Sequence, residues 1–485
     1  MADTPPVTPN DTFASFQITD LKITTCNKQN IDLKANYVEI NLYESVFSPV
    51  VVGDILIVDQ FDFPSFGPLL GGEDITIQIT NILSDDKSNN KENIFHFVVY
   101  SVEKRIVSLQ RSQTYLLKFC SKEAIWNQEV RICTTFFQQK YSLMTDNIFD
   151  AWNEEIKKMY GGDPYPDAPK FLFTADSKDE EKVTIHFPNL HPLECFFYLA
   201  GKAEKKKEGN PYFFFETLDN YFNFISWYDL IEKFNHNKEG NVPKDLQIDT
   251  SSYKKNKPIL INSVASLLKD TGPKADTSFY HYPNDFFTPM TFSFDKDFDF
   301  IENTRKGVYA SELIVYDNTT KRIKQFKYSY DELYNKVPRI VDDQANALNT
   351  FKAKSDYKCP KYTQTYIKAI PSSSELFLKD KVDLSPEITK NYRILKLQEL
   401  NNDFLTVNLP GDTNVHAGFF ADVFFSAPAT YELKPSADPH FAGVYFMLRV
   451  RHCFKSDNSF VTSVELSKDS FMDITIQKLP PPPKE

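Results

Sequence analysis

Hydrophobic and polar positions alternate along much of this chain, and a period of two predicts β-strands whose two faces differ in polarity. The alternation is clear over residues 16–23, 37–43 and 74–79, and an apolar run at 50–59 follows a turn at Pro49. Strand-like runs that recur at short intervals between turn signals are typical of a barrel or a sandwich. The N-terminal part of the chain is therefore predicted to be a β-domain.

The period changes to that of a helix after Glu123. Apolar residues then recur three or four positions apart, which marks one face of a helix, and Gly161 and Gly162 are expected to end it. That face consists of Met144, Ile148, Trp152, Ile156 and Met159. A second helix is predicted to begin at Pro192 and to stop at Gly209, since proline favours the first helical position. Its apolar face consists of Leu193, Phe196, Phe197, Ala200 and Ala203.

Strand patterns return in the second half of the chain. Two hairpins are predicted, one from residues 212–217 and 221–225 and one from residues 307–317 and 323–328. From residue 392 onward the chain is expected to be β again.

One strand-turn-strand pattern occurs twice. Residues 95–102 and 114–123 form the first copy, and residues 445–452 and 460–469 form the second. Each copy ends in a serine, a lysine and an acidic residue. A duplicated β-module indicates quasi-symmetry, which is more typical of assemblies than of enzymes, although unrelated hairpins also converge on such a pattern.

The simplest organisation has two β-modules with a helix-bearing module between them. The predicted boundaries are 1–123 for the first β-domain, 124–210 continued by 230–300 for the helix-bearing α/β domain, 211–229 plus 301–330 plus 391–476 for the second β-domain, 331–390 for a peripheral insertion and 477–485 for a Pro-rich tail.

Composition supports the β assignment and narrows the function. Phe 43 and Tyr 25 far exceed Met 6 and Trp 3, and aromatic residues favour strands. The net charge of −11 argues against gripping nucleic acid through its phosphates, although it allows DNA to pass without sticking. The six cysteines form no C-x-x-C pair, so we expect neither a zinc knuckle nor a disulfide framework, and we expect folding in a reducing cytosol. We expect no signal peptide, and no direct insertion into a membrane, because no apolar run is long enough to span a bilayer.

The sequence predicts no catalytic, cofactor-binding or metal-binding residue. Phosphate-loop, dinucleotide, zinc-peptidase and α/β-hydrolase motifs are absent from the sequence. His191 and Cys195 are four apart near a helix start, but two ligands do not make a metal site. His452 and Cys453 are adjacent on a strand and point to opposite faces, so we expect His452 to meet a backbone carbonyl instead.

Five glycines are assigned a structural role at turns or strand starts, where positive φ or a bulge is expected. They are Gly53, Gly307, Gly411, Gly418 and Gly443.

Several segments resemble the central baseplate hub proteins of contractile-tailed phages. Residues 41–49 and 53–59 resemble the first domain of that family, and residues 305–317 resemble another stretch common to it. The C-terminal block is also similar, through residues 409–412, 415–418, 443–445 and 466–470. The resemblance extends to the hub portion of VgrG spikes in type VI secretion.

This resemblance implies a mainly β fold with α+β insertions, in which two tube-like β-barrel domains flank a helix-bearing α/β domain. It implies a homotrimeric ring that adapts a six-fold tail tube to a three-fold spike and surrounds the DNA channel, without catalysis or cofactor. The implied partners are the tail tube protein, a separate central spike protein and baseplate wedge proteins, with the tape measure protein as a further candidate. The implied location is the virion tail baseplate, after assembly in the host cytoplasm.

Two other functions stay open at this point. The chain could be the hub of a phage-like contractile injection system, which genomic neighbours would separate from a phage. It could also be a tail-associated protein that binds or hydrolyses glycans, but with Asp+Glu 66 the sequence nominates no carboxylate pair.

Overall fold

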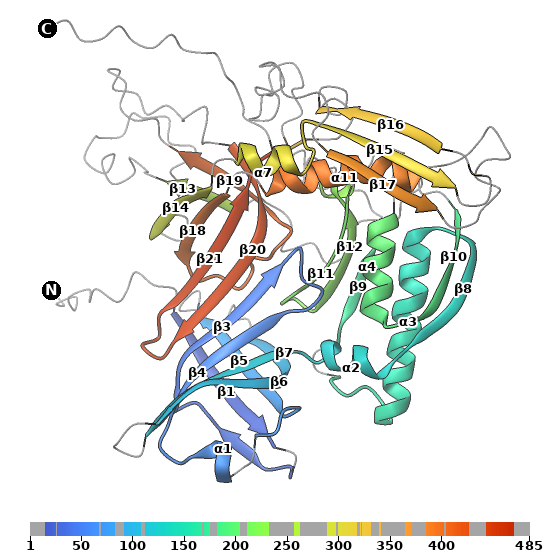
Figure 1. Ribbon diagram of the computed structural model, residues 1–485. Coiled ribbons are helices and arrows are strands. Elements are labelled where there is room, and N and C mark those ends of the chain that lie inside the picture. Colours follow the sequence, from blue (N-terminus) through green and yellow to red (C-terminus); the bar gives the residue numbers. More distant parts are fainter. Residues whose placement is uncertain are drawn as a thin grey trace, which may run out of the picture.

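A single antiparallel-rich sheet dominates the molecule (Figure 1). The computed structural model describes residues 15–25, 27–66, 69–82, 92–107, 112–166, 169–174, 182–203, 211–231, 257–261, 289–296, 299–317, 321, 323–330, 339–340, 364–370, 385–401, 404–425 and 443–469. Within these residues the large sheet has 13 strands, and eleven of them follow the order β14-β18-β21-β20-β3-β4-β7-β6-β5-β1-β2. The remaining two are β19, which pairs with β20, and β13, which pairs with β19.

The first β-module supplies the N-terminal strands of this sheet. They are β1 (Ser15–Thr24), β2 (Asn30–Asp32), β3 (Tyr37–Ser45), β4 (Val52–Asp59), β5 (Asp74–Ile82), β6 (Glu92–Val107) and β7 (Gln113–Ser121), with the short helix α1 (Phe63–Phe66) after β4. Alternate residues such as Ile55 and Ile57 are fully buried, as the period of two predicts. Leu21 of β1 and Ile40 of β3 belong to one apolar cluster although their strands are far apart in the strand order, so the sheet curls around its core.

The second β-module supplies the rest of the sheet from dispersed parts of the chain. Its strands are β13 (Lys257–Ile261), β14 (Thr291–Lys296), β18 (Phe404–Pro410), β19 (Phe420–Phe425), β20 (Gly443–Lys455) and β21 (Phe460–Ser467). Leu405, Phe446 and Leu466 are among the buried side chains of its core.

An α/β region lies beside the two β-modules (Figure 1). Its elements are α2 (Glu123–Glu129), β8 (Ile132–Gln139), α3 (Tyr141–Tyr160), β9 (Phe171–Thr174), β10 (Val183–Leu190), α4 (Pro192–Lys202), β11 (Tyr212–Thr217) and β12 (Tyr221–Ser226). Strands β8 and β10 form a two-stranded sheet, and β11, β12 and β9 form a three-stranded one. Helices α3 and α4 pack against each other and share a core with both sheets.

A third group of elements lies above the sheet in Figure 1. It contains α7 (Phe300–Arg305), α11 (Ser385–Leu400) and a three-stranded sheet of β15 (Ala310–Asp317), β16 (Ile323–Ser329) and β17 (Gln364–Ile370). Strand β17 comes from the predicted insertion and pairs parallel with β15, so part of that insertion completes the sheet of a predicted hairpin.

The predicted fold class, mainly β with α insertions, is confirmed. The two predicted helices also exist. Helix α3 ends at Gly161, which adopts a φ of 72°, although Met159 on its predicted apolar face is exposed. Helix α4 starts at Pro192 as predicted but ends at Lys202, before Gly209, which lies outside the described residues.

The assignment of strands to sheets differs from the sequence prediction in three places. The hairpin of β11 and β12 was expected in the second β-module but bonds to β9 in the α/β region. Phe213 of this hairpin still packs into the second module's core while Phe214 packs under α4, because the hairpin is buried on both faces. The hairpin of β15 and β16 likewise forms its own sheet with β17 rather than joining the second β-module. Strands β13 and β14 were expected in the α/β domain but belong to the large sheet.

The chain is helical where strand structure was expected from residue 392. Helix α11 runs to Leu400 and buries Lys396 and Glu399 together with Leu395 and Leu400. Because charged residues occupy buried positions, the apolar stripe that would announce a helix is interrupted in the sequence.

Candidate functional site: the junction between the two β-modules

The two predicted repeats form hairpins of the same plan. Both β6–β7 and β20–β21 are antiparallel, and each contains a corresponding bulge in its first strand; β6 has a second bulge, between Glu103 and Ile106, that β20 lacks. The register of the first hairpin shifts between Val99 and Ser101, and that of the second shifts between Met447 and Arg449. The neighbouring strands correspond as well. The order β4-β7-β6-β5 in the first module matches the order β18-β21-β20-β19 in the second, so β4 corresponds to β18 and β5 to β19.

Beside each corresponding bulge, the backbone amide of a glycine from another segment donates a hydrogen bond to the first strand of the hairpin. The amide of Gly72 donates to the carbonyl of Val99 at 2.8 Å, and the amide of Gly418 donates to that of Met447 at 2.9 Å. These glycines have φ values of 92° and 86°, in the left-handed region that glycine adopts at little cost. Met447 therefore corresponds to Val99, and the two hairpins share a bulge and a glycine contact at equivalent positions.

The structural alignment differs slightly from the sequence alignment. Val464 and Leu466 of β21 are buried, and so are Leu117 and Phe119 of β7. When the buried faces of β7 and β21 are superimposed, Ser467 corresponds to Cys120. The sequence match had paired Ser467 with Ser121, which is one residue further along. The shared serine-lysine-acid ending is therefore not a structural correspondence, because a shift of one residue exchanges the faces of a strand.

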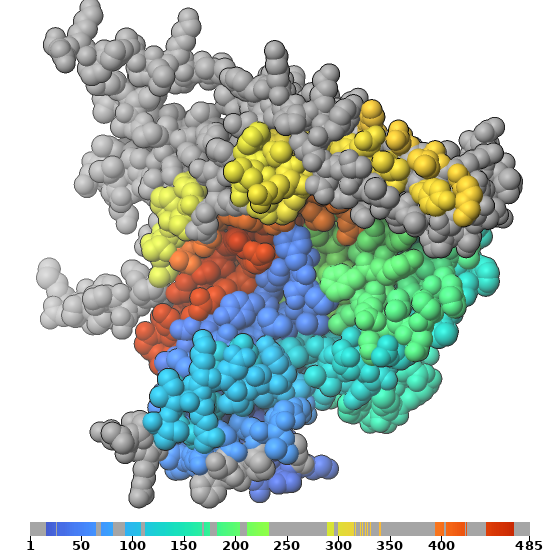
Figure 2. Space-filling view, viewed as in Figure 1, coloured from blue at the N-terminus to red at the C-terminus, as the bar shows by residue number. Residues whose placement is uncertain are grey.

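Strand β3 joins the two modules into one sheet. It pairs with β4 along one edge and with β20 along the other, where Ser45 lies opposite Arg449 and Glu39 opposite Lys455. In the space-filling view the blue surface of this part of the chain runs up between the red second module and the green α/β region (Figure 2). We call the pairing of β3 with β20 the junction.

Aromatic packing strengthens the junction on its inner face. Phe454 of β20 and Phe460 of β21 stack with ring centroids 4.2 Å apart, and both belong to the core of the first β-module. Phe16 of β1 meets Phe454 edge to face at 5.1 Å. Since such buried aromatic pairs contribute beyond their buried area, the second module helps to hold the first module together.

Polar contacts cover the outer face of the junction. The guanidinium of Arg451 donates to Glu39 Oε1 at 2.8 Å and to Asn41 Oδ1 at 2.9 Å. Asn41 in turn donates to Asp54 Oδ1 at 2.8 Å. The Arg451 side chain is partly exposed, so these contacts define the register more than they stabilise the fold.

A buried carboxylate connects all three parts of the molecule at the junction. Glu44 of β3 is fully buried and accepts hydrogen bonds from the amides of Leu218 and Ala417, each at 2.8 Å, and from His416 Nδ1 at 2.9 Å. Leu218 lies in the β11–β12 turn of the α/β region, and His416 lies in the loop before β19 of the second module. We call Glu44, His416 and the neighbouring His452 the junction cluster.

The two histidines of the junction cluster differ in protonation. Burial alone would lower the pKa of His416, but the Glu44 carboxylate offsets this and raises the pKa to about 9. Burial lowers the pKa of His452 to about 4, so this ring is neutral at pH 7. His452 Nε2 lies 3.1 Å from the carbonyl of Val415, which confirms the predicted contact with the backbone. The cluster is therefore a buried ion pair beside a neutral histidine.

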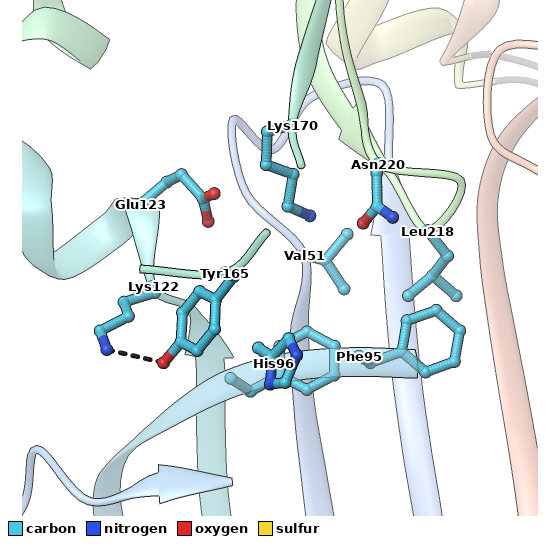
Figure 3. A pocket seen from close by; sticks show the side chains of 10 residues that line it. Val51, Phe95, His96, Lys122, Glu123, Tyr165, Lys170, Leu218 and Asn220 are labelled. Atoms are coloured by element: carbon cyan, nitrogen blue, oxygen red, sulfur yellow. Dashed lines mark hydrogen bonds between the residues drawn. The ribbon is translucent and has the colours of Figure 1, made fainter. Parts of the chain in front are cut away.

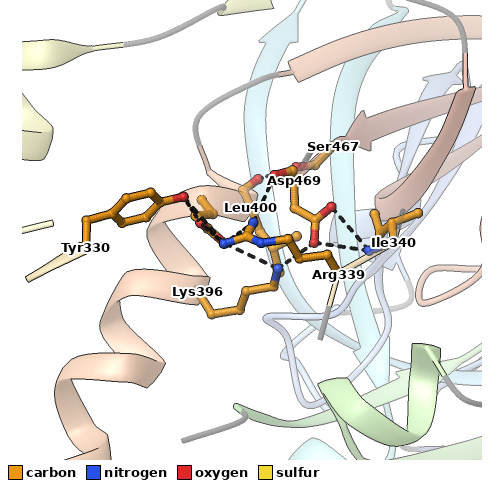
Figure 4. A network of polar contacts seen from close by, with 8 residues as sticks. Tyr330, Arg339, Ile340, Lys396, Leu400, Ser467 and Asp469 are labelled. Carbon is orange, nitrogen blue, oxygen red and sulfur yellow. Dashed lines mark hydrogen bonds and ion pairs between the residues drawn. The ribbon is translucent and has the colours of Figure 1, made fainter. Parts of the chain in front are cut away.

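A second buried network fastens α11 to the end of the large sheet (Figure 4). Lys396 bonds to Asp469 and to Glu399, and Arg339 bonds to Glu399 Oε1 at 3.0 Å. Tyr330 also donates to Glu399. Burial would raise the pKa of Glu399, but the two cations offset this and hold it below its ordinary value. Two cations and two carboxylates balance, so the network fits a structural role.

A small cavity lies where β4, β6 and the α/β region meet, and Glu123 and Lys170 point into it (Figure 3). Its volume of about 20 Å³ is room for roughly one water and not for a substrate. Burial raises the pKa of Glu123 to about 7, with Lys170 opposing the rise. Tyr165 stacks on His96 at 4.2 Å and donates to Asp74, which closes the cavity on one side. The geometry offers no substrate site here.

The five predicted glycines fall into two groups. Gly307, Gly418 and Gly443 have positive φ. Gly53 and Gly411 do not, but a Cβ atom on either would lie within 2.4 Å of an aromatic ring, that of Phe119 or Phe460. Gly53 lies in the first module, Gly411, Gly418 and Gly443 lie in the second, and Gly307 lies between α7 and β15, so the five glycines do not converge on one site.

The histidine and cysteine near the start of α4 are occupied in the fold. His191 Nδ1 lies 3.1 Å from the carbonyl of Val130, and burial raises the pKa of Cys195 to about 12, which disfavours the thiolate that metals bind. In the part of the chain that the structure describes, no three His, Cys, Asp or Glu residues cluster as metal ligands, and none of the helices has the length and hydrophobicity to cross a bilayer.

Glu44 is a buried functional residue that the hydrophobic pattern of the sequence does not single out. The signal was present, since alternation places Ile40, Leu42 and Glu44 on the same inward face of one strand. An acidic residue at such a position requires buried partners, and these come from remote parts of the chain.

No family model matches this chain, and no curated protein matches it. The solved structures to which this chain is similar include phage tail proteins and VgrG complexes. The tail protein from Neisseria meningitidis MC58 is 9% identical, with 94% of this chain and 97% of that chain covered and a TM-score of 0.45. The 43 kDa tail protein of prophage MuSo2 from Shewanella oneidensis is 9% identical, with 93% and 98% covered and a TM-score of 0.47. The half-lidded Francisella PdpA-VgrG complex is 9% identical, with 94% and 58% covered and a TM-score of 0.39. At these values the likeness transfers no function to this chain.

Proposed function

We propose that this protein is the central hub of a phage tail baseplate, in which three copies form a ring around the DNA channel. The observation that carries the proposal is the junction: one chain joins two β-modules of the same plan, edge to edge, into a single sheet. Three such chains would present six similar modules to a six-fold tail tube. The same three chains would present a three-fold face to a spike.

The interior of the molecule supports a structural role over a catalytic one. The buried charges of the junction cluster and of the α11 network are paired within the chain, and the cavity beside Glu123 has room for about one water. The net charge of −11 suits a channel through which DNA passes without binding. The proposed hub is therefore an adaptor without catalysis or cofactor.

The proposed partners follow from this position in a tail. They are the tail tube protein, a central spike protein and baseplate wedge proteins, with the tape measure protein as a further candidate. The proposed location is the virion baseplate, after assembly in the host cytoplasm.

Light scattering of the purified chain, followed by negative-stain electron microscopy of the same fraction, tests this proposal. A particle of three chain masses with a central hole is the expected result. A chain that stays monomeric at high concentration, both alone and when co-expressed with the spike protein, would contradict the proposal.

A further inference from the structure

The two corresponding hairpins differ at one edge. The edge of β20 that faces away from β21 is covered first by β19 and then by β3. The corresponding edge of β6 is covered by β5 only up to Val98. Within the described residues, no strand pairs with this edge over residues 100–107, which we call the outer half of β6. Ile106 and Val107 there are 68% and 70% exposed.

The counterpart of β3 in the second module is β14. Leu42 of β3 lies opposite Gly53 of β4, which lies opposite Phe119 of β7. In the same way Phe294 of β14 lies opposite Leu405 of β18, which lies opposite Leu466 of β21. Phe294 therefore corresponds to Leu42, and β14 corresponds to β3. Since β3 covers the outer part of β20 at the junction, the equivalent strand for the outer half of β6 is β14.

Within one chain these two strands cannot meet through the sheet. Strand β14 stands at one end of the strand order, and six strands separate it from β6. Only a second copy of the chain can bring a β14 to the outer half of β6.

We propose that β14 of one copy pairs antiparallel with the outer half of β6 of the next copy, repeating between chains the junction that β3 and β20 form within a chain. The proposal rests on the proposed ring and names the surface that closes it. Asn41 lies opposite Cys453 in the junction. Their counterparts are Ser293 and Ile106, where Ile106 is matched through the partner strands, since it lies opposite Thr114 of β7 as Cys453 lies opposite Val461 of β21, and β6 has an additional bulge between Glu103 and Ile106. Ser293 of one copy is therefore expected opposite Ile106 of the next, and Phe292 opposite Val107.

The chemistry of the two strands fits this pairing. In this register the exposed Val107 would lie directly opposite Phe292, with Phe294 on the same face, and aromatic with β-branched pairs stabilise neighbouring strands; Ile106 would lie opposite Ser293 on the other face. An uncovered strand edge is prone to aggregation unless another strand or a loop covers it. Each chain carries one β14 and one outer half of β6, so the contact is head to tail and gives a ring if its rotation closes.

Cysteine cross-linking of the full chain tests the register. Cys133 is exposed and is replaced by serine in every variant. The pair Ser293→Cys with Ile106→Cys is bridged with a short bis-maleimide, since register partners lie about 5 Å apart between Cα atoms. We expect covalent dimers and trimers, nothing larger, and at least ten-fold more product than from either single variant. The pair Ser293→Cys with Glu103→Cys lies out of register and serves as the matched control.

The possible outcomes separate this proposal from the proposed function. A trimer by light scattering without cross-linking above the single variants overturns the β14–β6 pairing and leaves the hub proposal standing. A monomer without cross-linking, both alone and when co-expressed with the spike protein, overturns both.

A charge at the exposed edge provides a second measurement that does not depend on cross-linking. Val107→Asp is expected to raise the concentration for half-assembly at least ten-fold, whereas Leu70→Asp, on a loop and 76% exposed, is expected to leave it unchanged. Equal assembly of both variants overturns the pairing.

Discussion

Strands β20 and β6 follow one plan but end in opposite environments. The outer half of β20 is sealed by β3, and its Cys453 and Phe454 are buried. The corresponding Ile106 and Val107 of β6 are mostly exposed. Two β-modules with the same strand order can therefore differ in whether the edge of the equivalent strand is paired. At the junction the cover is another part of the same chain, held by the junction cluster, and breaking that cluster should make β20 resemble β6.

The largest effect is expected from removing the buried carboxylate of the junction. Glu44→Ala leaves the His416 charge and two backbone amides without their partner, and breaking a buried pair costs about 3–5 kcal/mol. We expect the free energy of unfolding to fall by that amount in urea at pH 7. Glu39→Ala, which removes a carboxylate from the outer face of the same strand, is expected to cost about 0–1 kcal/mol. Equal losses from the two variants would show that the cluster does not hold the junction.

The second effect is a dependence on pH. The pKa of folded His416 is about 9, above its unfolded value of about 6.5, so its stabilisation is complete below pH 6.5 and is lost as the pH rises through 9. Between pH 6.5 and 9.5 the wild-type chain should lose about 3 kcal/mol of unfolding free energy relative to His416→Gln.

His452 provides the control of opposite sign. Its folded pKa of about 4 is below the unfolded value, so its stabilisation is present above pH 6.5 and is lost as the pH falls toward 4. Parallel pH profiles of wild type and His416→Gln between pH 6.5 and 9.5 would mean that Glu44 does not pair with a charged histidine.

A third, smaller effect concerns close packing behind the junction. A Cβ atom at Gly53 would lie 2.4 Å from the Phe119 ring and 2.5 Å from the carbonyl oxygen of Asn41. Gly53→Ala should therefore destabilise the chain by about 1–3 kcal/mol, as overpacking does. Gly201→Ala, in α4 with open space around it, should be neutral or stabilise by up to about 1 kcal/mol. Thermal unfolding of both variants checks this, and a loss at Gly201 equal to that at Gly53 would contradict the role of close packing.

Local patterns allowed most hairpins and both long helices of the α/β region to be predicted. Alternation identifies a strand because it reports which face is buried, and Gly161 identifies a helix end because its φ is positive. The sheet to which each strand belongs could not be predicted in the same way. The run Phe213–Phe214–Phe215 is buried on both faces, so it carries no polar face to indicate its neighbours.

Buried charge explains the other failures. Lys396 and Glu399 interrupt the apolar stripe of α11, and Glu44 interrupts that of β3, because each is neutralised by a residue far away in the sequence. Their distant partners are Asp469, Arg339 and His416, which are 73, 60 and 372 positions away. Hydrophobic periodicity has no means of anticipating them, since it describes only neighbours along the chain.

The smallest effect is expected on the outer face of the junction and sharpens the contrast with Glu44. Arg451 bridges the modules through Glu39 and Asn41, but its side chain is 42% exposed. Arg451→Ala should cost about 0–1 kcal/mol at low salt and less in 1 M salt, because a partly exposed pair is screened there. Urea unfolding at the two salt concentrations measures this difference. A loss as large as that of Glu44→Ala, unchanged by salt, would mean that the register contacts of the outer face carry the junction and that the buried cluster does not.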